Sequence, residues 1–224
     1  METADTKYRI QHTLYKFLLL LLAFFLPLTL YLVTLAPTYI PIDSAEFALC
    51  MNFWGLCHPP GFPLYIIVGK IFTAIWPFGT LIYKANLLSA IFGAGTVLLV
   101  FLTLTQLKVR REIALMVALF WAVNQILWEF SISADVFTFA SFLIVLNFYL
   151  VFKRLRYPAF FVLGLSASHF YISAVLMPVL AWYFLREFRV KSLGDTEIFG
   201  FDGFFLCSWL FPSGLDVLAH ASQS

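Results

Sequence analysis

The sequence predicts an all-α protein that crosses a membrane several times. Of its 224 residues, 62% are hydrophobic and only 12% are charged, whereas soluble domains have about 25% charged residues. Its mean hydropathy is +0.92. Apolar segments occupy residues 17–36, 62–78, 85–107, 113–128, 136–152 and 159–185. Because a helix needs about 20 apolar residues to cross the hydrocarbon core, these segments are the candidate membrane helices.

The first apolar segment, 17–36, follows a polar and basic stretch at 1–16. It is too long for the hydrophobic part of a signal peptide and lacks a small-residue cleavage site, so we expect an uncleaved first helix. Lys7, Arg9 and Lys16 then place the amino terminus on the cytoplasmic side, because positive charges favour that side. Residues 37–84 become the first outer loop.

The segment 62–78 decides the rest of the topology. If it crossed the membrane, the basic residues at 108–111 would lie outside, against the positive-inside rule. If it lies along the outer surface, the basic groups at 108–111, 153–156 and 186–191 all fall inside. Lys70 in its middle and Gly and Pro at its ends also favour an interfacial helix. This topology places six polar side chains on the outer side: Asp43, Glu46, His58, Lys84, Asp135 and His169.

Asp43 and Glu46 are three residues apart, which is the spacing of a capping box at the start of a helix. In that interpretation Asp43 accepts hydrogen bonds from backbone amides. In a second interpretation Asp43 is a general base at the membrane surface and Glu46 orients a substrate. The two roles are compatible, because a cap also fixes the geometry of its carboxylate.

The stretch that follows reads HPPGFP at 58–63 and is conformationally stiff, because each proline restricts itself and the residue before it. It forms either a rigid corner that lays the next helix flat or a corner that also points His58 at the pocket of Asp43.

The sequence has three cysteines, Cys50, Cys57 and Cys207, and this odd number gives no disulfide framework. Cys50 and Cys57 could form a bridge if their loop faces an oxidising compartment. We expect instead that both cysteines are unlinked and act as small apolar residues of a helix and its end.

Three further polar residues have two interpretations each. Lys84 is either a lysine whose ammonium reaches the membrane surface or a cation for a lipid-linked phosphate. Asp135 precedes an apolar helix and is either a loop charge or its N-cap. His169 lies in an apolar stretch, where polar groups face the protein interior or a cavity, so it is a site residue or a packing histidine.

Several classes of function are disfavoured. The net charge of +2 and the absence of a basic, aromatic-rich patch in the sequence predict no nucleic-acid partner. The sequence has no phosphate-binding loop, no Gly-x-Ser-x-Gly elbow and no metal-ligand spacing. We therefore predict no cofactor, although two acids could hold a divalent cation. We divide the chain into a cytoplasmic terminus at 1–16, a transmembrane module at 17–194 and a divergent or truncated tail at 195–224.

Five motifs in order resemble the GT-C membrane glycosyltransferases, and in particular the bacterial relatives of the animal transmembrane protein O-mannosyltransferase. They are DSAEF at 43–47, HPPGFPLY at 58–65, KANLLSA at 84–90, ADVFT at 134–138 and GLSASH at 164–169. The ordered set is far more specific than any one motif. The resemblance covers residues 30–178.

The resemblance implies a GT-C type N-terminal module that transfers a mannose-like sugar from a polyprenyl-phosphate donor. The acceptor would be a hydroxyl of a protein, glycan or lipid, and the active site would lie on the extracytoplasmic face of a bacterial plasma membrane. Asp43 takes the position of the catalytic acid, and Asp135 that of a second acid, usually Glu. Lys84 stands where related sequences usually have Arg, and a lysine cannot form the bidentate hydrogen bonds that an arginine makes with a phosphate.

Two other functions stay open at this point. One is a truncated, non-catalytic module, because such enzymes normally continue with further membrane helices. The other is a transporter of a lipid-linked sugar, which predicts inverted repeats or paired broken helices in the two halves of the chain, and the sequence shows neither.

Overall fold

The computed structural model describes residues 2–40, 43–179 and 182–183. Within these residues the chain forms α-helices and one 3-10 helix, and no strand. The chain divides into two compact units at 1–177 and 178–224, and all helices named below lie in the first. The predicted tail at 195–224, the predicted boundary at 194 and Cys207 lie outside the described residues.

The helices follow one another in the order α1 (Glu2–Val33), α2 (Ser44–Phe53), α3 (Pro63–Ile75), α4 (Leu81–Gln106), α5 (Arg111–Ala122), α6 (Gln125–Ser131), α7 (Val136–Phe152), α8 (Arg156–His169) and the 3-10 helix η1 (Tyr171–Val175). By length and composition, α1 and α4 can each cross a membrane, and α5 with α6 forms a third span if the bent pair counts as one. The chain is an all-α membrane protein, as the sequence predicted.

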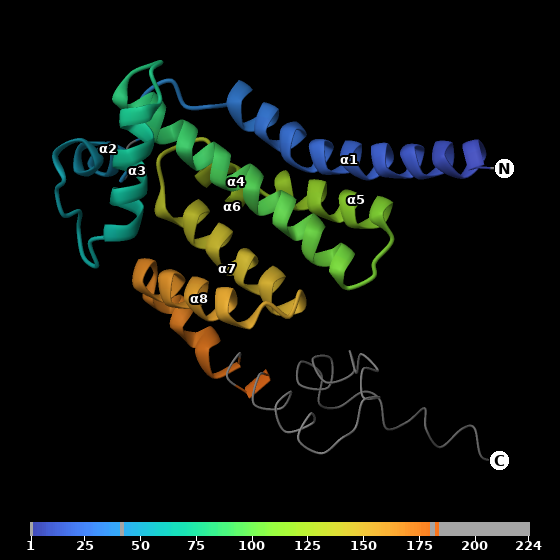
Figure 1. Cartoon of the computed structure of the whole chain (residues 1–224). Helices are drawn as coiled ribbons and strands as arrows, with labels where there is room; N and C mark the ends of the chain where they lie inside the picture. Colours follow the sequence, from blue (N-terminus) through green and yellow to red (C-terminus); the bar gives the residue numbers. More distant parts are fainter. Residues whose placement is uncertain (1, 41–42, 180–181, 184–224) are drawn as a thin grey trace, which may run out of the picture. The chain divides into compact units, whose positions relative to one another are not determined.

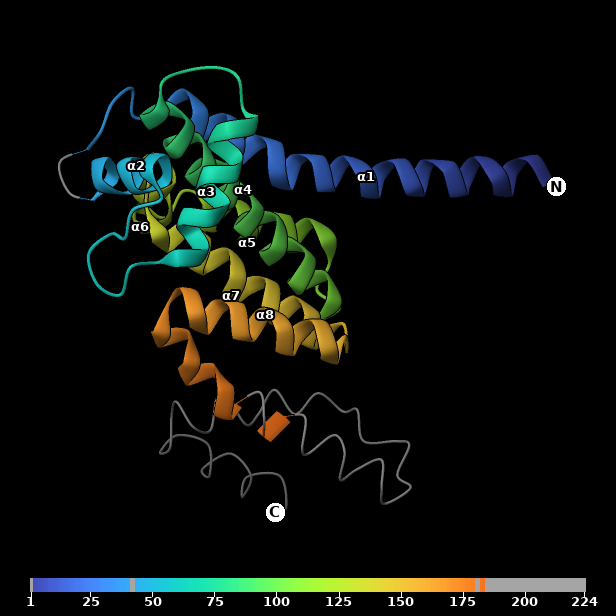
Figure 2. The same cartoon turned by 60° about the vertical axis from the view of Figure 1, so that its left-hand side comes forward.

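Helix α4 lies at the centre of the packing. It contacts α1, α2, α3, α5, α6 and α7, and α8 packs against α7. Figures 1 and 2 show α2 and α3 at the end of α4 where that helix begins, and α7 beside α4 with α8 next to it. Small buried residues on α4, such as Ala90, Gly93 and Ala94, let its neighbours approach closely. The polar first turns of α4 therefore lie where several loops meet.

The predicted span at 113–128 is wrong as a single helix. Helix α5 ends at Ala122, α6 begins at Gln125, and their axes differ by 66°. The Asn124 side chain accepts a hydrogen bond from the backbone amide of Ile126 at 3.1 Å and so caps α6. Because an asparagine that caps a new helix competes with continuation of the old one, the chain bends here.

The segment predicted at 62–78 forms α3, which has 13 residues. Such a helix is about 20 Å long, shorter than the ~30 Å hydrocarbon core. Tyr65 and Ile66 are buried on one face, whereas Ile71 and Ile75 are exposed on the other. This two-sided character agrees with an interfacial helix, and its placement at a membrane surface stays a prediction.

The predicted segment 159–185 is also divided. Helix α8 ends at His169, and Phe170 has an extended backbone before the 3-10 helix η1 begins. Most of the segment beyond residue 179 lies outside the described residues.

Candidate functional site

The candidate site is built around Asn86, in the first turns of α4. Its side chain is fully buried. Its Nδ2 donates to the carbonyl oxygens of Ala36, at 2.9 Å, and Thr38, at 3.3 Å, in the loop that leads to Asp43. Its Oδ1 accepts from the backbone amide of Ala134, at 2.8 Å. One amide side chain therefore joins the loops that precede both Asp43 and Asp135.

Ser89, three residues later on the same helix face, continues this connection. Its Oγ accepts a hydrogen bond from the backbone amide of Asp135 at 3.1 Å. The same oxygen lies 3.3 Å from the hydroxyl of Tyr65, a fully buried residue of α3. Helix α4 thus holds the backbone of Asp135 and the start of α3 through one hydroxyl group.

Asp135 forms the N-cap of α7, so the capping interpretation is confirmed. Its Oδ1 accepts from the backbone amide of Phe137 at 2.9 Å. Burial, together with the negative charge of Asp43, raises the pKa of Asp135 to about 6, although hydrogen bonds from the amides of Phe137 and Val136 and the charge of His58 act in the opposite direction. This carboxyl group therefore gains or loses its proton close to neutral pH.

Asp43 lies immediately before α2, but the capping-box prediction for its side chain is wrong. Its backbone has φ −105° and ψ −10°, near the helical region instead of the extended geometry of an N-cap, and its carboxylate makes no cap hydrogen bond. Ser44 ties the preceding loop instead, since its Oγ accepts from the amide of Ile40 and donates to that residue's carbonyl, both at 2.9 Å. Among the described residues, no hydrogen bond or ion pair reaches the Asp43 carboxylate.

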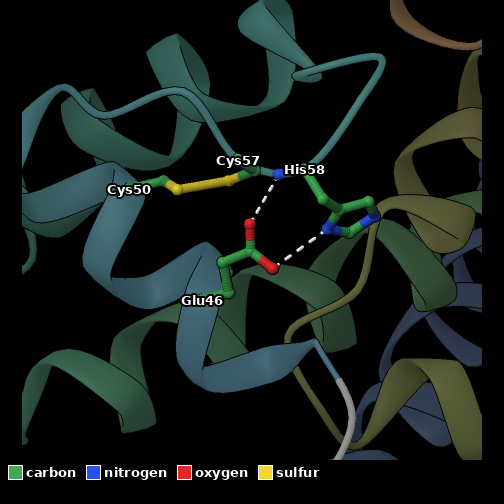
Figure 3. Close-up of a disulfide and its surroundings, with 4 residues drawn as sticks. All are labelled: Glu46, Cys50, Cys57 and His58. Atoms are coloured by element: carbon green, nitrogen blue, oxygen red, sulfur yellow. Dashed lines mark hydrogen bonds and ion pairs between the residues drawn. A yellow bond between two sulfur atoms is a disulfide. The ribbon is translucent and has the colours of Figure 1, made fainter.

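Glu46 does not reach back to the start of α2 as a capping box requires. One carboxylate oxygen accepts from the backbone amide of His58, and the other lies 3.0 Å from its Nδ1, as Figure 3 shows. The hydrogen bond to Glu46 raises the pKa of His58, and the same bond lowers the pKa of Glu46. The charges of Asp43 and Asp135 raise the His58 pKa further. The two side chains form an ion pair when the imidazole is protonated.

Asp43, Glu46 and His58 come together as the sequence suggested. One ligand atom of each lies within 4.8 Å of the others, so these three residues could hold a metal ion. The ring of His58 packs against Phe47 and Phe62, at centroid distances of 5.7 and 5.6 Å. The rings fix the orientation of the imidazole while about 40% of its side chain stays exposed.

Cys50 and Cys57 form a disulfide, so the prediction of two unlinked apolar cysteines is wrong (Figure 3). Helix α2 ends at Phe53, and Trp54 adopts a left-handed backbone conformation with φ 54°. This turn sends the chain back along the last turn of α2, which brings the two Cα atoms to 6.0 Å. Sequence spacing alone does not reveal the reversal, because tryptophan is not a typical left-handed residue.

Lys84 and His169 make contacts of a structural kind. The Lys84 ammonium donates to the carbonyl of Thr73 at 3.1 Å, in the last turn of α3, where a cation is favourable. His169 is buried, and its Nε2 lies 3.1 Å from the carbonyl of Val136. Its ring packs 4.8 Å from that of Phe139. His169 therefore ties the end of α8 to the start of α7, as a packing histidine does.

Residues 43–193 match the family described as the N-terminal domain of protein O-mannosyl-transferase TMEM260. The chain belongs to this family. It is 32% identical over 96 residues to the protein O-mannosyl-transferase TMEM260 of Mus musculus, and the aligned region covers 43% of this chain and 14% of that protein. It is 25% identical over 123 residues to the protein of the same name from Dictyostelium discoideum, and the aligned region covers 54% of this chain and 15% of that protein. No solved structure matches the chain significantly.

The match includes every candidate site residue, from Asp43 to His169. It confirms the family resemblance that the five ordered motifs indicated. The chain spans only a small part of the length of these relatives, 14% and 15% in the aligned regions. The chain therefore belongs to a family whose members are named as glycosyltransferases.

Asn86 and Ser89 hold the site together, but neither is among the site residues predicted from the sequence. A signal was present. Both are polar and lie three residues apart in a mostly apolar helix, where polar residues generally face the protein interior. Their backbone partners lie 46 to 50 residues away in the chain, so the partners were not evident from spacing.

Proposed function

We propose that this chain is the N-terminal module of a membrane glycosyltransferase that moves a mannose-like sugar from a polyprenyl-phosphate donor to a hydroxyl acceptor on the extracytoplasmic face. Membership of a family named for protein O-mannosyl-transferases supports the transfer reaction. The assignment of the site rests on the surroundings of the Asp43 carboxylate. This carboxylate makes no hydrogen bond to the described residues, yet it lies beside the Glu46–His58 pair and close enough to Asp135 to raise its pKa.

In the proposed reaction Asp43 is the general base. The acceptor hydroxyl donates a hydrogen bond to the Asp43 carboxylate and loses its proton to it as the oxygen attacks the anomeric carbon. The bond from that carbon to the phosphate oxygen breaks, and the polyprenyl phosphate leaves with the electron pair. A single displacement of this kind inverts the anomeric centre, as in glycosidases that act in one step.

The other site residues have supporting roles in this proposal. Glu46 holds His58 through Nδ1 and leaves the Nε2 atom of the ring for the substrate. Asp135, with a pKa of about 6, lies close enough to Asp43 for the two charges to interact. Lys84 would have to release the Thr73 carbonyl to reach a phosphate, so it serves the donor only after a local rearrangement.

A transfer assay tests the proposal. Membranes that contain the chain are given radiolabelled polyprenyl-phosphate mannose, and label in an acceptor is measured for wild type, Asp43→Asn and Glu129→Gln. We expect Asp43→Asn to lower transfer by about 10²-fold or more, because a general base is lost. Glu129→Gln is the matched control, because Glu129 is an exposed acid of α6 outside the candidate site.

Two results would contradict the proposal in different ways. Transfer by Asp43→Asn at the wild-type rate would refute the catalytic role of Asp43. No transfer by the wild-type chain, under conditions in which a full-length relative transfers label, would favour a non-catalytic module.

A further inference from the structure

The disulfide between Cys50 and Cys57 closes a short loop beside the candidate site. The sequence separation is 7 residues and the Cα atoms are 6.0 Å apart, within the range usual for disulfides. Both side chains are buried, with 7% exposure each. The turn is close, since the backbone amide of Gly55 donates to the carbonyl of Cys50 at 3.0 Å. The bridge is therefore an integral part of the packing of this turn.

The bridge also joins the two chain segments that carry the Glu46–His58 pair. Cys50 follows Glu46 by four residues in α2, so both lie on one face of the helix. Cys57 directly precedes His58. The pair itself is about 40% exposed, where an ion pair contributes little by itself. Figure 3 shows the bridge beside the Glu46–His58 pair. A covalent link one residue from His58 limits how far its amide and ring can move from the Glu46 carboxylate.

Formation of such a bridge depends on the compartment. Disulfides persist in the bacterial periplasm, the endoplasmic reticulum lumen and outside the cell, whereas cytosolic thiols are kept reduced. The charge pattern of the sequence places the same loop outside by an unrelated physical effect. Two independent properties, the positive charges and the cysteine pair, thus assign the loop to the same side.

We propose that the Cys50–Cys57 bridge is a modification made on the extracytoplasmic side of the membrane and that it holds His58 against Glu46 at the candidate site. The two thiols lose two protons and two electrons. The disulfide of a thiol oxidoreductase takes them up through a mixed disulfide and leaves as a dithiol. This inference deepens the proposed function, since it assigns the face and the redox state of that site, but neither test below depends on sugar transfer.

The first test counts free thiols. The chain with Cys207→Ser is produced in bacteria, the cells are trapped in acid, and the denatured protein is treated with a polyethylene-glycol maleimide before or after reduction. We expect no labelled thiol before reduction and two after it. The same chain with Cys50→Ala added should show one labelled thiol without reduction, that of Cys57. In a host without its periplasmic thiol oxidase, both thiols of the Cys207→Ser chain should react.

Two labelled thiols before reduction, in the host with its oxidase, would overturn the inference and the assignment to the oxidising face. Such a result would leave the transfer chemistry of Asp43 untouched. Conversely, a chain that forms the bridge but transfers no sugar would keep this inference and contradict the proposed function. The two failures are therefore distinguishable.

The second test measures the imidazole of His58 by NMR titration of histidine-labelled protein in detergent, with His58→Asn used to assign its signal. The charged groups that act on His58 are Glu46 and Asp43 beside α2 and Asp135 before α7. We expect the pKa of His58 to lie above 6.5 in the oxidised chain and to fall toward 6.5 in Cys50→Ala/Cys57→Ala and in Glu46→Gln. A mild reductant added to wild type should reproduce the effect of the double variant without a substitution. An unchanged pKa after loss of the bridge would overturn its role in holding His58.

Discussion

The Asn86 side chain provides the most direct test of how the site is assembled. Asn86→Ala removes three hydrogen bonds, two of 2.8 and 2.9 Å and one of 3.3 Å, from a fully buried position. The carbonyls of Ala36 and Thr38 and the amide of Ala134 lose their partner. Each buried polar group without a partner costs about 1 to 3 kcal/mol. Water that enters the space satisfies part of this loss, so we expect a destabilisation of about 2 to 4 kcal/mol.

A second buried asparagine offers the matched control. Asn147 on α7 is equally buried, but its Nδ2 makes one hydrogen bond, to the carbonyl of Ala159 at 2.7 Å. Asn147→Ala therefore removes one hydrogen bond, and we expect it to cost about 2 kcal/mol less than Asn86→Ala. For a chain of this length that difference corresponds to about 4 to 8 °C in Tm. Thermal unfolding of both variants in one detergent, followed by tryptophan fluorescence, gives the comparison.

A negative charge at position 86 should also destabilise the chain. Asn86→Asp keeps an oxygen for the amide of Ala134 but turns a carboxylate toward the carbonyls of Ala36 and Thr38, so it should destabilise at least as much as alanine. Equal Tm values for Asn86→Ala and Asn147→Ala, or an Asn86→Asp variant as stable as wild type, would refute the view that Asn86 joins the two loops.

Two further predictions concern stability. The pKa of Asp135 is about 6 in the folded chain, compared with 3.8 for an aspartate in an unfolded chain. Because the folded state binds this proton more tightly, the stability of the chain should fall as pH rises from about 4 to 6. Asp135→Asn should remove this dependence, on the order of 3 kcal/mol, in unfolding measured across that range; an unchanged pH profile would contradict the assignment. A Cβ on Gly93 of α4 would lie 2.8 Å from the Cβ of Ser131 and 3.2 Å from the ring of Tyr31, so Gly93→Ala should cost about 1 to 3 kcal/mol. Gly164→Ala in α8, where no atom lies within 4 Å of the new Cβ, should be neutral or stabilising in the same assay, and a reversed order would contradict the packing of α4 against α6.

Hydropathy and helix signals predicted the all-α membrane fold and much of its outline. The predicted segment 136–152 has the same bounds as α7, because Asp135 supplies a cap and a sustained apolar run follows it. The segment 85–107 begins four residues late, since α4 starts at Leu81 and its first turns hold the polar Lys84 and Asn86. Periodicity does not show that a helix has begun before its apolar run.

The site was predicted in part. The convergence of Asp43, Glu46 and His58 followed from their place in one loop and is present in the structure. The partner of Glu46, the bridge of Cys50 and Cys57 and the function of Asn86 were not predicted. Each depends on a chain reversal or on a contact between segments distant in sequence, and local patterns of residue type carry no signal for either.

The bend between α5 and α6 makes α6 part of the structure that supports the site. The end of α1 bonds to both sides of the break, since the Tyr31 hydroxyl donates to the carbonyl of Ala122 at 2.8 Å and the Trp128 indole donates to the Thr34 hydroxyl at 2.9 Å. The amide of Ala36 also donates to the carbonyl of Ile132, directly after α6. These bonds connect α6 and the loop toward Asp43 on both sides of the break at residues 123–124. A tilt of α6 would carry this loop with it, so the position of the segment before Asp43 depends on a short helix from another part of the sequence.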